Sequence, residues 1–231
     1  QLKINRRMTN GLSIITSYTF AKGMGFQTGD DGGLWTYIEP RRSYARTDFD
    51  RTHTFNQSYV YELPWGPGKK WMNRGFASKV IGGWQVNGIL TLMTGTPLTF
   101  GADGSVLNTP GSPQTADQVG PFQVLGGINT PSKGGSPWFL QSSFVQPTGI
   151  RFGSTGRNIA SGPGFFNLDA SLFKIFHVTE RWRAEIRGEA FGVTNTPQFS
   201  NPTTAVNNSN YGYITGAGGG RGMQLGAKLT F

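Results

Sequence analysis

The chain has 231 residues, and its 21 basic and 12 acidic side chains give a formal net charge of +9. It contains no cysteine, which excludes disulfides, thiolate catalysis and cysteine-ligated metals. No stretch approaches about 18 consecutive apolar residues, so no transmembrane helix is predicted. The basic residues are scattered along the chain rather than gathered in runs, which argues against nucleic-acid binding.

Alternation of apolar and polar residues predicts a series of long β-strands. The first segment, residues 2–8, ends at a tight Thr9-Asn10-Gly11 turn of the hairpin type. The later segments with the same period of two are 12–20, 54–63, 84–93, 166–173, 182–190 and 221–231. The mean hydropathy of −0.33 and the aromatic content of 13% suit strands with one apolar face and one wet face.

The segment 182–190 shows the two faces most clearly. Small or apolar side chains at even positions alternate with four charged side chains: Arg183, Glu185, Arg187 and Glu189. Four charges on one face require water there, and their alternating sign predicts pairing along the strand. The pattern indicates a sheet with one solvated face, in a soluble protein or in a membrane barrel.

The connections between the predicted strands separate these two alternatives. Short links at residues 9–11 and 178–181 alternate with long Gly/Pro/Ser/Thr/Asn-rich ones at about 22–48, 101–163 and 195–220. Outer-membrane barrels have short periplasmic turns and long extracellular loops. The sequence therefore predicts an all-β, antiparallel, up-and-down transmembrane β-barrel segment of about seven or eight long strands, with residues 1–231 as a single outer-membrane barrel region.

Two connections are expected to contain structure of their own. Residues 136–152 are expected to add a short strand. Residues 64–82 lie on the periplasmic side, where the other connections are short, yet this connection is long. We expect it to form an amphipathic helix at the membrane surface. Its apolar side would carry Trp71, Phe76 and Val80, and its basic side Lys69, Lys70, Arg74 and Lys79.

Single-chain bacterial barrels have even strand numbers, and seven long strands would leave two unpaired edges, which lipid does not tolerate. The strand at 2–8 is short, has Arg6 in its apolar register, and begins without an export signal or initiator Met. We therefore expect that 2–8 does not pair with 221–231, and that the chain forms an open curved sheet belonging to a larger barrel, with residues 101–163 mostly irregular.

Several segments occur in an order known from one receptor family. They are Asn5–Lys22, Asp50–Phe55 followed by Tyr61–Gly68, Gly82–Ile89, Gly156–Ile159 with Gly162–Lys174, and Glu189–Pro202. These segments resemble the barrel hairpins of TonB-dependent outer-membrane receptors of the Oar-like kind, which carry a carboxypeptidase-regulatory-like domain and a plug before the barrel. The last segment departs from the family at Gly192 and Thr196, where Asn and His are expected.

The resemblance implies the carboxyl-terminal part of a barrel of about 22 strands in the bacterial outer membrane, serving active uptake of a bulky solute. The implied partners are outer-membrane lipid and lipopolysaccharide, a plug domain, TonB, the barrel-assembly machinery and an unidentified solute. The terminal Phe231 resembles the signal that the assembly machinery recognises. The residues expected to face the lumen and contact plug or solute are Asp169, Arg183, Glu185, Arg187, Glu189, Gln224 and Lys228.

Other candidate sites favour simpler interpretations. His53 and His177 are the only histidines and lack neighbouring ligands, so packing is favoured over metal binding. Asp30-Asp31 is too small a cluster to argue for calcium. The glycine-rich stretch 216–222 lacks the following helix that would bind phosphate, so a flexible loop is favoured. We expect no catalytic residues, no metal and no cofactor.

Two other functions stay open. One is a passive porin or small autonomous outer-membrane barrel. The other is a surface-assembled β structural protein whose exposed strand edges template a polymer.

Overall fold

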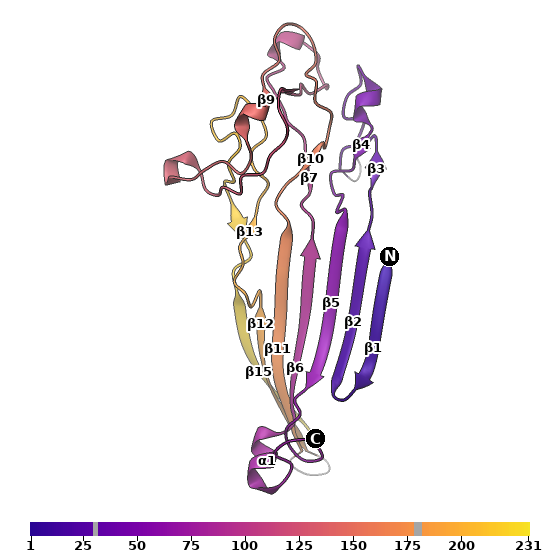
Figure 1. The fold of residues 1–231 in the computed structure, drawn as a ribbon, viewed down its shortest axis with the longest axis vertical. Helices are drawn as coiled ribbons and strands as arrows, with labels where there is room; N and C mark the ends of the chain where they lie inside the picture. The colour runs from indigo at the N-terminus through magenta and orange to yellow at the C-terminus, as the bar shows by residue number, and fades with distance from the viewer. Residues whose placement is uncertain (30–31, 178–181) are drawn as a thin grey trace.

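The computed structural model describes residues 1–29, 32–177 and 182–231, and its main feature is one seven-stranded antiparallel sheet (Figure 1). Each long strand pairs with the next long strand along the chain, in the order β1-β2-β5-β6-β11-β12-β15. Their bounds are Leu2–Thr9, Leu12–Phe20, His53–Glu62, Trp84–Met93, Phe165–His177, Arg183–Phe191 and Gly222–Thr230. All seven predicted strands are confirmed, and the up-and-down topology with them. The predicted turn at 178–181 lies outside the described residues.

The register places the alternating apolar positions of the seven strands on one face, although a few apolar side chains share the other face with the polar residues, among them Ile15, Val60, Ile89, Phe173 and Ile175. On β12 and β15, Ile186 lies opposite Ala227 and Ala190 lies opposite Met223, while the charged residues between them share the other face. Two polar side chains on the apolar face are hydrogen-bonded to each other: Gln57 Nε2 donates to Thr16 Oγ1 at 3.0 Å across the β2–β5 ladder. Arg6 is opposite Ile14, so its predicted place in the apolar register is confirmed.

A glycine in the apolar face makes room for a tyrosine ring from the neighbouring strand. Gly88 of β6 lies opposite Tyr59 of β5. A Cβ atom at Gly88 would lie 2.4 Å from Tyr59 Oη, so the tyrosine ring occupies the space above the glycine. The ring thereby covers backbone that would otherwise face the surrounding medium.

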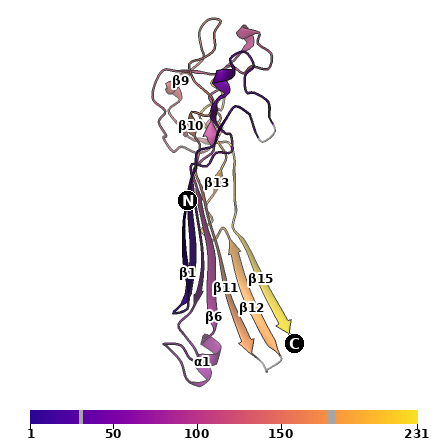
Figure 2. The ribbon, with the colours of Figure 1, turned by 90° about the vertical axis from the view of Figure 1, so that its right-hand side faces the viewer.

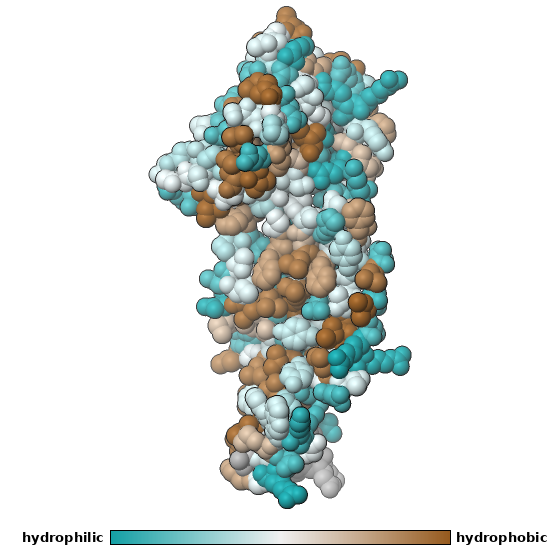
Figure 3. Space-filling model, in the orientation of Figure 1, coloured by the Kyte–Doolittle hydropathy of each residue, from teal (hydrophilic) through white to brown (hydrophobic). Residues whose placement is uncertain are grey.

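The sheet is curved and open. β12 and β15 turn away from the surface formed by β1, β2, β5 and β6 (Figure 2). Hydrophobic residues gather across the middle of the sheet on the face turned toward the viewer, which is the outer side of this curve (Figure 3). Among the strands that the structure describes, β1 is hydrogen-bonded to β2 alone and β15 to β12 alone, so the expectation that 2–8 and 221–231 do not pair is confirmed.

The connections segregate to opposite ends of the sheet as predicted. The turn after β1 and helix α1 (Gly75–Ile81) lie at one end with the carboxyl terminus, and the long connections lie at the other (Figure 1). The helix is shorter than predicted, so placing Lys69, Lys70, Trp71 and Arg74 on it was wrong. Pro64 and Pro67, together with positive φ at Gly66, Gly68 and Met72, prevent an earlier start. No helix among the described residues is long and apolar enough to cross a membrane.

The described residues of 21–52, 94–164 and 192–221 form what we call the loop cap. Residues 101–163 are mostly irregular, as predicted, and the strand expected within 136–152 is only the two-residue β9. The cap contains β3 (Met24–Gly25), β4 (Ala45–Arg46), β7 (Pro97–Leu98), β8 (Asp117–Gln118), β9 (Phe144–Val145), β10 (Ala160–Ser161), β13 (Gln198–Phe199), β14 (Ala217–Gly218) and the 3-10 turns Pro40–Ser43, Ser105–Leu107, Pro131–Lys133 and Gln141–Ser143.

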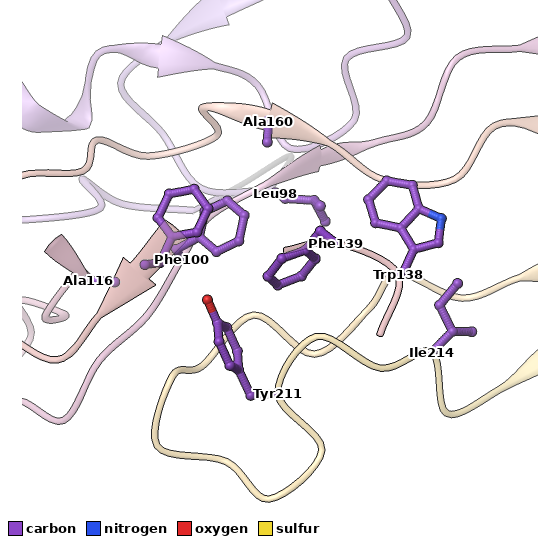
Figure 4. Close-up of a cluster of buried hydrophobic side chains, with 9 residues drawn as sticks. Leu98, Phe100, Ala116, Trp138, Phe139, Ala160, Tyr211 and Ile214 are labelled. Carbon is purple, nitrogen blue, oxygen red and sulfur yellow. The ribbon is translucent and has the colours of Figure 1, made fainter. Parts of the chain in front are cut away.

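An aromatic cluster forms the core of the cap (Figure 4). Phe100 and Phe139 are fully buried, and Phe144 stacks on Phe100 with ring centroids 3.7 Å apart. Tyr211 meets the edge of Phe139 from the connection before β15, with a centroid separation of 5.4 Å. The same burial raises the pKa of the Tyr211 phenol above its ordinary range. The long connections are therefore packed against one another around a core.

Arginines tie the first long connection to the second. Arg42 Nη2 donates to the carbonyl oxygens of Gly153 at 2.8 Å and Thr155 at 2.9 Å. The buried Arg157 in turn donates to the Ser43 carbonyl at 3.2 Å and pairs with Asp48 at 3.3 Å. Part of the basic excess thus satisfies carbonyl oxygens within the cap.

The carboxylate of Asp48 is the acceptor at the centre of this network. Burial pushes its pKa up, but hydrogen bonds from Asn158 and the Gly29 N–H, with the charge of Arg157, outweigh that effect. The pKa therefore lies below its ordinary value, and Asp48 is ionised wherever the cap is folded near neutral pH.

Candidate functional site

The seven residues predicted to face a lumen all lie on the polar face of the sheet, within three neighbouring strands. β12 contributes four of them, β15 two and β11 one. Glu185 is directly opposite Lys228, and Glu189 is directly opposite Gln224. The register follows from the apolar alternation, because a slip of one residue would move every charge to the apolar face.

The predicted ladder of charges is only partly formed. Arg187 Nε lies 3.9 Å from Glu189 Oε2, and the Gln224 side-chain amide donates to the same carboxylate oxygen. Opposite Arg187 stands Gly226, and a Cβ atom at that glycine would lie 3.0 Å from Arg187 Nε. The absent side chain lets the arginine lie flat across β15 while its charge stays in water.

Asp169 is part of the polar face but does not join the cluster around Glu189. Its Oδ1 accepts a hydrogen bond of 2.8 Å from the Gly192 N–H. Gly192 has a φ of +59°, a left-handed conformation that glycine adopts without strain. Asp169 therefore secures the turn where the chain leaves β12 for the loop cap.

The middle of the polar face carries a second set of polar groups that the sequence did not single out. Thr91 Oγ1 donates to Asn56 Oδ1 at 3.1 Å, and Asn87 Nδ2 donates to Ser171 Oγ at 3.3 Å. Both hydrogen bonds cross between strands. The alternation of Asn, Gln, Ser and Thr in 54–63 and 84–93 was the available signal, but neutral side chains give no indication of partner until the register is known.

Charge is therefore uneven across this face. Its β12–β15 side presents charges of both signs, whereas the middle of its β5–β6 side presents amides and hydroxyls beside Val60 and Ile89, with the single carboxylate Glu62 at the end of β5. Such a wall can hold a hydrated polar solute or another protein surface through many hydrogen bonds.

The remaining candidate residues have other surroundings. His53 Nδ1 lies 2.7 Å from Tyr18 Oη, and its ring packs on Phe20 at 5.3 Å, so the packing interpretation is confirmed for this histidine. The side chain of His177 and the pair Asp30-Asp31 lie outside what the structure describes. Among the described residues no group of three metal-binding side chains occurs.

The glycine-rich stretch 216–222 was expected to be a flexible loop, and part of it is paired. Residues Ala217–Gly218 form β14 against β13, and Gly222 begins β15. Gly216 also accepts a backbone hydrogen bond of 3.0 Å from Ser200. The stretch therefore forms a ribbon that leads from the cap into the last strand.

The terminal aromatic residue has a partner at the end of the sheet. The ring of Phe231 stacks on Trp182 with centroids 5.2 Å apart. Both belong to the apolar register, one residue beyond the paired Arg183 and Thr230. Aromatic side chains at this height are typical of the interfacial girdles of membrane barrels.

The strand lengths agree with a membrane wall. β5 and β6 have 10 residues each, which corresponds to about 34 Å of strand and, at a tilt of about 45°, to about 24 Å of bilayer. The outward apolar face and the polar inner face complete the pattern expected of a barrel section.

Comparison with known proteins agrees with this architecture. The family model described as an outer membrane beta barrel domain matches residues 1–224. No curated protein and no solved structure matches the chain. The match places the protein in the bacterial outer membrane, and the chain belongs to the outer-membrane β-barrel domain family.

Proposed function

We propose that the chain is the carboxyl-terminal barrel portion of a TonB-dependent outer-membrane receptor for active uptake of a bulky solute. The observation that carries the proposal is the open sheet: seven curved strands whose outer edges, at β1 and β15, pair with no other strand among the described residues. Exposed backbone groups cost several kcal/mol each in lipid, so the membrane wall requires further strands. A wall larger than seven strands agrees with the resemblance of the hairpins to such receptors.

In this proposal the polar face lines the lumen. Glu185, Arg187, Glu189 and Lys228 would contact a plug or the passing solute, and the loop cap would be the first surface that the solute meets. The net charge of +9 would favour anionic solutes or the phosphates of lipopolysaccharide. The role is that of a transporter, and no residue is proposed to catalyse a reaction.

A passive porin or small autonomous barrel is the main alternative, and it fits the polar wall equally well. It would require β1 and β15 to meet, either with each other or through additional strands. A surface-assembled β structural protein is the second alternative, in which each open edge would pair with another copy.

Electrical conductance in planar lipid bilayers separates these functions without knowledge of the solute. The natural full-length protein should give no steady KCl conductance, because a plug fills the lumen, and should conduct after urea releases the plug. Stable stepwise conductance without urea would favour the porin instead. Fibres or sheets formed in the absence of lipid would favour the structural protein.

A further inference from the structure

A group of hydrophobic side chains is exposed at the end of the sheet that carries the short turns. We call residues 71–81 the end collar. Phe76 is 82% exposed, Trp71 52% and Val80 50%, and Met72 and Ile81 are exposed as well. Five large apolar side chains within eleven residues are unusual for a connection that faces only water.

Backbone contacts join the collar to the residues on either side of it in the same connection, and its hydrophobic side chains are exposed on this backbone. The Trp71 N–H donates to the Pro64 carbonyl at 3.0 Å, and Gly66 N–H donates to Trp71 O at 3.1 Å. Gly66 and Gly82 pack backbone against backbone, since a Cβ at Gly82 would lie 2.4 Å from the Gly66 Cα. These contacts fix the backbone conformation from which the exposed side chains project.

A lysine connects the collar to the lipid-facing wall. Lys174 belongs to the apolar register of β11, opposite Trp84 of β6. Its ammonium group donates to the Val80 carbonyl of α1 and lies 4.5 Å from the centroid of the Phe176 ring. The apolar face of the sheet is therefore continuous with the collar, at the level where lysine and aromatic side chains commonly mark the edge of the hydrocarbon.

The collar and the residues directly before it are also basic. No acidic residue occurs between Glu62 and Asp103. Lys69 is neutralised by Glu62 at 2.5 Å, but Lys70 lies over the Trp71 ring at 5.5 Å, and Arg74 is exposed beside the helix. Apolar side chains flanked by cations match a surface of anionic headgroups above acyl chains.

We propose that the end collar inserts into the periplasmic leaflet of the outer membrane and binds anionic glycerophospholipid there. Phe76, Val80 and Trp71 enter the boundary between headgroups and acyl chains, and Lys70 and Arg74 meet lipid phosphates. The collar thereby sets the height of the barrel in the bilayer. This inference rests on the outer-membrane location and does not depend on whether the barrel transports a solute.

Spin labels at two matched positions test the insertion. These 231 residues contain no cysteine, so in a full-length protein whose other cysteines, if present, are replaced by serine, Phe76→Cys and Ile150→Cys can each carry a single nitroxide. The two native side chains are 82% and 83% exposed, and Ile150 lies in the loop cap. In bilayers of phosphatidylethanolamine and phosphatidylglycerol, the label at 76 should be more accessible to oxygen than to a water-soluble nickel chelate, and the label at 150 the reverse. Equal nickel accessibility at both positions would overturn the proposal.

A charge reversal tests the choice of lipid. In the Phe76→Cys background, Lys70→Glu with Arg74→Glu should raise nickel accessibility at position 76 by about twofold or more in phosphatidylglycerol bilayers. The matched control, Arg41→Glu with Lys133→Glu in the loop cap, should leave it unchanged. Heat-modifiable migration verifies that every variant is folded. No change on reversal at 70 and 74 would overturn the assignment to anionic lipid.

Discussion

The sheet and the loop cap use hydrophobic side chains in opposite ways. In the sheet, regular strands leave Leu225 91% exposed and Met223 75% exposed. In the cap, irregular backbone surrounds Phe100 and Phe139, which are fully buried. All the buried hydrophobic residues that the described chain provides lie in the cap. The sheet is thus built for a surrounding apolar medium, and the cap has a core of its own in water.

The comparison shows that regular backbone pairing and burial of side chains occur in different regions of this molecule. The strands satisfy their backbone groups through the ladder and leave side-chain burial to lipid. The cap combines scattered backbone hydrogen bonds with side-chain ones, in which Arg42, Arg46 and Arg157 donate to carbonyl oxygens, and it buries its own aromatic rings. A substitution in the cap should therefore change stability through the packing of its buried core, and a substitution on the apolar face of the sheet through its contact with lipid.

The largest effect is expected in the core of the cap. Phe100→Ala should destabilise the cap by about 3–5 kcal/mol, because it removes a fully buried ring that stacks on Phe144. Fluorescence of Trp138, which belongs to the same cluster, and hydrogen exchange of cap amides measure the loss. Val119→Ala, at a side chain 63% exposed, is the control. If the whole sheet unfolded together with the cap, the two regions would be one cooperative unit.

The next effect distinguishes the two faces of the sheet. Leu225→Arg should cost about 2–4 kcal/mol near the bilayer midplane, whereas Gln224→Arg on the adjacent polar face should cost little. The free energy of unfolding by urea in lipid bilayers measures both. Equal costs would contradict the assignment of the apolar register to lipid.

A smaller effect is expected at the carboxyl terminus in vitro. Phe231→Ala removes the stack on Trp182, which is worth about 0.5–1.5 kcal/mol. In cells, deletion of Phe231 should reduce folded protein in the outer membrane more than this stability loss implies. Phe20→Ala, an exposed aromatic at the other end of the sheet, is the control. Unchanged surface levels after deletion would argue against an assembly signal.

The smallest effect concerns acid. Because the pKa of Asp48 is lower in the folded cap than its ordinary value of 3.8, its contribution is present above that value and is lost as the pH falls through the folded pKa. The side chain is 42% exposed, so the contribution should be below about 1 kcal/mol. Acid titration of Trp138 fluorescence should show this transition, and Asp48→Asn should abolish it. A transition that persists in Asp48→Asn would assign it to another group.

Much of the sheet was predictable because a sustained alternation of apolar and polar residues arises from a β-strand, whose successive side chains point to opposite faces. The register placed Arg183, Glu185, Arg187 and Glu189 on one face without knowledge of their partners. The partners were not predictable: Gly226 opposite Arg187 and the Asp169 bond to Gly192 depend on which strands meet and in which register. The presence of helix α1 was predicted but its length was not. Proline and residues with positive φ end a helix through the backbone angles of individual positions, which the amphipathic pattern does not reveal.

The sequence by itself determined the strands, their two faces and the end at which each connection lies, because alternation and turn chemistry are local properties. Only the tertiary structure decided that the long connections share an aromatic core, since Phe100, Phe139 and Tyr211 come from distant segments with no common period. It also decided how the open sheet curves, whereas the sequence had already predicted that β1 and β15 do not pair. Closure depends on the summed curvature of all the strands, and no single segment carries that quantity.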